Sequence, residues 1–129
     1  MTHFRKLIFV ALTTLSASCV SAQSRPELDL SYEQATSIWQ KNRDRADYQT
    51  YLEAFTQWNN HFQLDTRGDC YAKGTEPVTV LLVVTERAVI EPVFSSLGGA
   101  KAECFRMSYL SLDVAKPPFS PLVIQLNMP

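Results

Sequence analysis

Histidine is scarce in this chain of 129 residues, which has two, and only His61 lies beyond the third residue. A zinc site takes three or four ligands, mostly His and Cys, and a nucleophilic triad needs a histidine beside its Ser or Cys. The acidic residues form no cluster at metal-ligand spacing, and Gly98-Gly99 lacks the surroundings of a phosphate-binding loop. We therefore expect no metal, no cofactor and no enzymatic activity.

Basic clusters are also absent. Twelve Lys and Arg residues are spread along the chain against thirteen Asp and Glu residues. Nucleic-acid binding needs Lys and Arg gathered on one face to neutralise phosphates, and an anionic membrane surface needs a similar patch. The sequence therefore predicts neither nucleic acid nor a membrane surface as a partner.

The N-terminal hydrophobic run is too short to span a bilayer core of about 30 Å. It begins at Leu7, directly after Arg5-Lys6, stays uncharged through residue 22 and ends in Val-Ser-Ala. This pattern is typical of a cleaved secretory signal. We predict a signal peptide at residues 1–22, a single mature domain at 23–129 and a periplasmic location with no membrane span after cleavage. Lipidation at Cys19 stays open as an alternative.

Removal of the signal leaves two of the three cysteines, Cys70 and Cys104. An even pair in an oxidising compartment is most simply a disulfide. Closing a loop of about 35 residues stabilises a protein by about 3–4 kcal/mol in the chain-entropy model. Two free buried thiols are the alternative, and the lack of a Cys-x-x-Cys spacing argues against a redox-active pair.

Two amphipathic helices are predicted at the start of the mature domain. Ser31 and Gln34 have the spacing of a capping box, and apolar residues then recur on one face to about residue 42. From Asp47, aromatic and apolar side chains recur at steps of three and four as far as Phe62. We expect the two helices to form a hairpin over residues 31–64.

Two strands and a third helix follow. Residues 78–85, VTVLLVVT, are apolar at almost every position, which predicts a strand covered on both faces. Residues 89–96 return as a second strand, in which Pro92 cannot donate to a ladder and indicates an edge or a bulge. The helix is expected over roughly residues 100–112, with Pro117-Pro118 to end it and turn the chain.

The last strand, residues 122–128, alternates apolar residues with Val123, Gln125 and Asn127, which predicts one solvent-exposed face. The all-apolar strand belongs in the middle of the sheet. The sequence therefore predicts an α+β fold, in which the N-terminal helix hairpin precedes a β-β-α-β unit. Its antiparallel three-stranded sheet has the order 2-1-3, and the third helix packs across it.

This order of β-hairpin, helix, proline pair and strand resembles the C-terminal domain of the TonB and TolA periplasmic proteins. The resemblance covers residues 70–129, and the placement of Cys70 and Cys104 looks like the TolA type, in which such a pair forms a disulfide. TonB and TolA proteins keep a membrane helix and a long spacer that transmit force, whereas here a cleaved signal and residues 23–69 precede the domain. The resemblance therefore implies a module that binds a protein or peptide in the cell envelope.

The strand at residues 122–128 carries no charge and no interior proline to guard its edge. A partner strand added there would gain affinity from main-chain hydrogen bonds, and we predict Val123, Gln125 and Asn127 as the partner-binding residues. Coverage of this edge by the N-terminal segments stays open. A second function also stays open, a periplasmic inhibitor or immunity protein that inserts the loop at residues 64–76 into a hydrolase or toxin.

Overall fold

The structure is a computed structural model that describes residues 29–129. Its elements in chain order are α1 (Tyr32–Asn42), α2 (Ala46–Phe62), the 3-10 helix η1 (Arg67–Lys73), β1 (Val78–Val84), β2 (Ile90–Ser95), α3 (Ala100–Tyr109) and β3 (Leu122–Met128). The predicted signal peptide at residues 1–22, with Cys19, lies outside the described residues.

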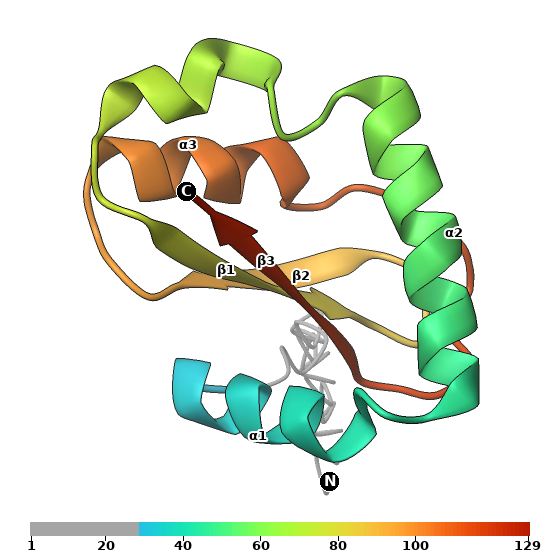
Figure 1. Ribbon diagram of the computed structural model, residues 1–129. Helices are drawn as coiled ribbons and strands as arrows, with labels where there is room; N and C mark the ends of the chain where they lie inside the picture. The colour runs from blue at the N-terminus through green and yellow to red at the C-terminus, as the bar shows by residue number, and fades with distance from the viewer. Residues whose placement is uncertain (1–28) are drawn as a thin grey trace, which may run out of the picture.

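The three strands form one antiparallel sheet in the order β2-β1-β3, which confirms the predicted α+β fold and strand order (Figure 1). β1 pairs with β3 along its whole length, from Val78 opposite Met128 to Val84 opposite Leu122. Its pairing with β2 is irregular, because the register shifts before Val84 at the level of Pro92. Proline lacks the N–H that a continuous ladder requires, so its place at this irregularity follows from its chemistry.

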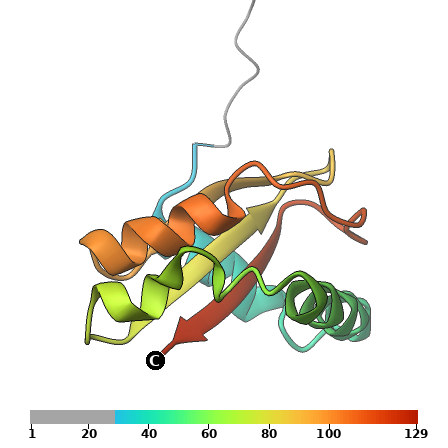
Figure 2. The same ribbon diagram turned by 90° about the horizontal axis from the view of Figure 1, so that it is seen from above.

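β1 is covered on both faces, as its apolar sequence predicts. The larger core lies under α3, α2 and η1 and includes Tyr48, Leu64, Val80, Leu82, Val84, Phe105, Tyr109 and Ile124. On the opposite face, α1 places Ala35 against Leu81, Val83 and Val123. Figure 2, seen from above, shows α3 and η1 in front of the sheet and α1 behind it. The sheet is therefore the middle layer of three.

The two N-terminal helices do not pack against each other as the predicted hairpin requires. α1 lies across β1 and β3, whereas α2 runs past the sheet at a steep angle to α1 (Figure 1). The buried side chains Tyr48, Tyr51 and Phe55 of α2 join the core on the face opposite α1. α1 covers the apolar face of the sheet that contains Leu81, Val83 and Val123, whereas α2 adds to the core on the other face, so the two helices separate. The turn at residues 43–45 carries the chain from one face to the other.

The helix ends agree with the sequence at α1 and differ at α3. The capping box of α1 is confirmed, because Gln34 N donates to Ser31 Oγ at 3.1 Å and Ser31 N donates to Gln34 Oε1 at 2.8 Å. α3 ends at Tyr109, well before Pro117-Pro118, because Leu110 leaves the helical conformation with ψ 132° and Ser111 follows in a left-handed conformation with φ 66°. The proline pair therefore does not end this helix.

Candidate protein-binding edge

Cys70 and Cys104 form the predicted disulfide. The bond joins η1, which leads into β1, to the middle of α3, and Cys70 is fully buried. Next to it, Tyr71 of η1 packs edge-to-face on Phe105 of α3, with the ring centroids 5.0 Å apart. The disulfide therefore fixes α3 to the segment that enters the central strand, as the sequence predicts.

The loop at residues 64–76, which the inhibitor alternative requires to project, lies against the domain. Residues 67–73 of this loop form η1, which packs along α3 and is tied to it by the disulfide. Gly68 and Asp69 have φ values of 69° and 55°, a left-handed turn that folds η1 back on the protein. A segment held down in this way lacks the projecting shape that insertion into a cleft needs.

The outer edge of β3 presents the backbone groups of Val123, Gln125 and Asn127. In an antiparallel sheet the N–H and C=O of one residue point to the same side, and successive residues point to opposite sides. Thr79 lies opposite Asn127 and directs its backbone groups toward β2, where Ser96 N donates to Thr79 O at 2.9 Å. Asn127 therefore directs its own N–H and C=O away from β1, and so do Gln125 and Val123 at steps of two.

Val123 forms the closed end of this edge. Its carbonyl oxygen accepts a hydrogen bond from the Tyr48 hydroxyl of α2 at 3.0 Å, and burial raises the pKa of that hydroxyl. The side chain of Val123 is 1% exposed and packs beneath α1. The prediction of a solvent-exposed face is therefore wrong at Val123, because α1 covers this part of the sheet. The backbone N–H of Val123 is therefore its only outward group that is free to bond to a partner among the described residues.

The edge opens beyond Val123. Gln125 is half-buried and Asn127 is exposed, and Asn127 Oδ1 accepts a hydrogen bond from Thr79 Oγ1 at 3.2 Å. Within residues 29–129, no hydrogen bond involves the outward N–H or C=O of Gln125 or Asn127. Two of the three predicted residues thus bring four unpaired backbone groups together on an uncharged strand.

The other edge of the sheet, along β2, is covered by the chain itself at Ile90. Ile90 N donates to Leu112 O at 3.0 Å, and Ser111 N donates to Ile90 O at 2.7 Å. Pro92, in the middle of β2, further interrupts this edge, as its lack of an N–H predicts. The contribution of residues 110–114 was not predicted, because no local pattern marks an irregular segment as the partner of a strand.

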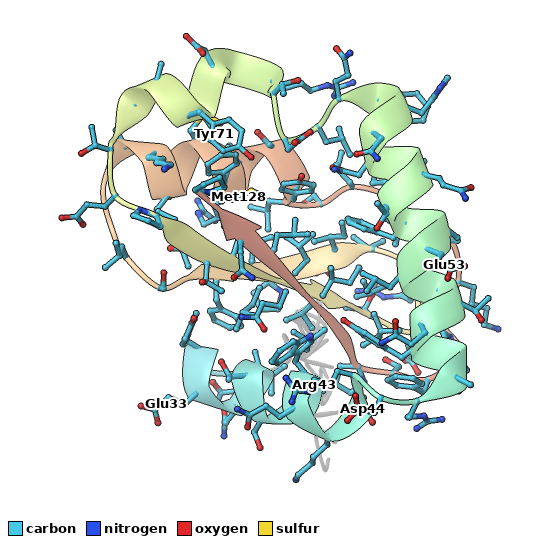
Figure 3. The ribbon with its side chains drawn as sticks, viewed as in Figure 1. Glu33, Arg43, Asp44, Glu53, Tyr71 and Met128 are labelled. Atoms are coloured by element: carbon cyan, nitrogen blue, oxygen red, sulfur yellow. A yellow bond between two sulfur atoms is a disulfide. The ribbon has the colours of Figure 1, made fainter. Side chains whose placement is uncertain are left out.

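Two side chains that the sequence analysis did not single out as site residues fix the far end of β3. Lys101 of α3 is 5% exposed, and its Nζ donates to Glu76 O and to Pro129 O, both at 2.8 Å. Tyr71 Oη donates to Met128 Sδ at 3.4 Å, and Figure 3 shows these two side chains together at the end of β3. α3 and η1 thus hold the last residues of β3 in line with β1.

The remaining candidate for chemistry that the sequence offered is the histidine of α2. His61 is exposed on α2, with its ring edge-to-face against Phe62 at a centroid distance of 4.8 Å. Residues 29–129 contain no group of three or more His, Cys, Asp or Glu side chains placed to hold a metal ion. A shallow hollow of about 530 Å³ lies beside the disulfide, where the Glu103 carboxylate pairs with Arg106 at 2.7 Å.

Among the described helices, none combines the length and hydropathy needed to cross a membrane.

Comparisons with known proteins give no relative. A scan against protein-family models, a search of curated proteins and a search of solved structures each found no match. The functional conclusion therefore depends on the fold, the disulfide and the β3 edge.

Proposed function

We propose that this protein is an exported, non-enzymatic binding module of the bacterial cell envelope. It docks an extended segment of a protein or peptide partner on the outer edge of β3. Two features support the resemblance of residues 70–129 to TonB and TolA C-terminal domains. They are the order β1-β2-α3-β3 and the disulfide between Cys70 and Cys104.

Export to the periplasm has two supports. The N-terminal sequence has the basic start, apolar run and small-residue end of a secretory signal. The disulfide is typical of a protein that folds in an oxidising compartment.

The observation that carries the binding function is the contrast between the two edges of the sheet. Proteins guard sheet edges with charge, proline, bulges or a covering segment. The β2 edge has both Pro92 and the hydrogen bonds to residues 111 and 112, whereas the β3 edge has neither charge nor proline at Gln125 and Asn127. A partner strand would bond to the four outward groups of these two residues, and its alternate side chains would supply selectivity.

A pair of substitutions at Asn127 tests this function. Asn127→Pro removes the outward N–H and places a ring at the edge, yet it leaves the ladder to β1 intact because that N–H points away from β1. Asn127→Thr changes the side chain and keeps the N–H, so it is the matched control. Each immobilised protein is exposed to a periplasmic extract, and the retained proteins are identified by mass spectrometry.

We expect a partner that the wild type and Asn127→Thr retain and Asn127→Pro loses. Circular dichroism and thermal unfolding establish that all three proteins are folded. Equal retention by folded Asn127→Pro and by the wild type would exclude the β3 edge as the binding site.

A further inference from the structure

Gln125, in the middle of the proposed binding edge, has an unpartnered side-chain amide. Its Oε1 is the one buried side-chain oxygen or nitrogen that lacks a hydrogen-bond partner among residues 29–129. Exchanging the amide oxygen and nitrogen would place the nitrogen at the buried position, where it would need an acceptor, and no hydrogen bond within the same residues involves either atom. The buried end of the amide therefore has no hydrogen-bond partner in the described part of the chain, and with the oxygen in this position it lacks a donor.

The neighbours of Gln125 on its face of the sheet explain why the donor is missing. Leu81 lies directly opposite it on β1, and Val123 lies two residues before it on β3. Both side chains are apolar and 1% exposed, so neither donates a hydrogen bond. A buried polar group without a partner is less favourable than an apolar group of the same shape. Stability alone would therefore favour an apolar residue at position 125.

We propose that Gln125 accepts a hydrogen bond from the docked partner strand, and that it selects a segment with an uncharged donor side chain at the paired position. The inference rests on the proposed function. Paired residues of adjacent strands project to the same face with Cβ atoms about 5 Å apart, so a Ser, Thr, Asn or Gln side chain reaches the amide. Lys and Arg fit poorly, because burying a cation beside Leu81 and Val123 is costly.

The residues that flank the donor in the partner strand project to the other face. There they meet the half-buried Leu126, and Tyr71 and Met128 lie at the end of β3 on this side. These contacts favour apolar side chains. The partner is thus an extended segment in which an uncharged donor residue stands between two apolar ones.

A displayed library of random seven-residue peptides provides the probe, panned on the wild type, Gln125→Leu and Asn127→Pro. On the wild type we expect enrichment of Ser, Thr, Asn or Gln between two apolar positions. Gln125→Leu should keep the apolar preference and lose the donor preference, and its thermal stability should equal or exceed that of the wild type. A selected peptide with Thr replaced by Val should bind the wild type about fivefold more weakly and Gln125→Leu equally well. Gln125→Met serves as a second variant if Gln125→Leu does not fold.

The variants separate the failure of this inference from the failure of the proposed function. Absence of enriched peptides, or enrichment that persists on Asn127→Pro, overturns the binding edge and the role of Gln125 together. In a third outcome, Asn127→Pro abolishes the enrichment, but the preference at the central peptide position is the same on the wild type and on the Gln125 variants. This result keeps the binding edge and overturns the role of Gln125.

Discussion

The hydroxyl of Tyr48 donates a hydrogen bond to the carbonyl oxygen of Val123, 3.0 Å away and 75 residues later in the chain. The bond joins the first turn of α2 to the outer edge of β3. Tyr48 and Val123 are each 1% exposed, so water cannot replace either group of the bond. This contact marks where the covered part of the edge ends and the open part at Gln125 begins.

Replacing Tyr48 with Phe should destabilise the protein. The substitution keeps the ring and leaves the Val123 carbonyl buried without this donor, so we expect the free energy of unfolding to fall by about 1–3 kcal/mol. Tyr32→Phe is the matched control, because the Tyr32 hydroxyl makes no hydrogen bond within the described residues, and its effect should stay within about 0.5 kcal/mol. Urea denaturation followed by tryptophan fluorescence measures both variants. A Tyr48→Phe protein as stable as Tyr32→Phe would contradict the role of this bond.

The strands and their order could be predicted because each depends on a local signal. The apolar run at residues 78–84 identifies a strand buried on both faces, and Pro92 assigns the next strand to an edge. The positions of α1 and α2 could not be predicted in the same way. An amphipathic pattern shows that a helix has an apolar face, but it does not show whether that face covers the other helix or a sheet.

The candidate site was predictable in its backbone and not in its side chains. Alternation along residues 122–128 gives the set Val123, Gln125 and Asn127, and these are the residues whose backbone groups face outward. Val123 is unavailable to a partner because Tyr48 bonds its carbonyl oxygen and α1 covers its side chain. Both contacts join segments at least 75 residues apart in the sequence, so no local pattern predicts them. The hydrogen bonds from Lys101 to Glu76 O and Pro129 O had one weak signal in the sequence. Lys101 lies four residues before the buried Phe105, which places it on the same helix face.

Removal of the disulfide should lower stability without changing the sheet. The bond closes a separation of 34 residues, and in the chain-entropy model its loss from a Cys70→Ala, Cys104→Ala double variant costs about 3–4 kcal/mol. Denaturation with and without reductant measures the effect. Reductant should destabilise the wild type by a similar amount and leave the double variant unchanged. Insensitivity of the wild type to a reductant that demonstrably frees both thiols would contradict this expectation.

Lys101→Met should loosen the far end of the binding edge. The substitution keeps most of the aliphatic stem and removes the ammonium that bonds Glu76 O and Pro129 O, so we expect a loss of about 1.5–3 kcal/mol. Lys116→Met is the control, because Lys116 is exposed and forms no hydrogen bond or ion pair with residues 29–129. Hydrogen exchange should show faster exchange of the last β3 amides in Lys101→Met alone. Equal amide exchange rates in the two variants would contradict the role of Lys101 in holding the end of β3.

Alkaline pH should destabilise the protein through its buried tyrosines. Burial raises the pKa of Tyr51 from its ordinary value of 10 to about 12, and the same cause raises the pKa of Tyr48 and Tyr109. Between these two values the unfolded chain loses a phenolic proton that the folded protein retains. The folded state then binds more protons, so the stability contributed by Tyr51 is complete below pH 10 and is lost as the pH rises to about 12.

The melting temperature should therefore fall steadily once the pH exceeds 10, and Tyr51→Phe should show a shallower fall than the wild type. The hydroxyl of Tyr51 also donates to Ala115 O at 2.7 Å, so Tyr51→Phe should begin from a lower melting temperature at neutral pH. Thermal unfolding by circular dichroism measures both effects, and recovery on return to neutral pH separates titration from chemical damage. If Tyr51→Phe and the wild type lose stability in parallel above pH 10, groups other than Tyr51 control the alkaline transition, because only a tyrosine that titrates differently in the folded and unfolded states contributes to the difference in slope.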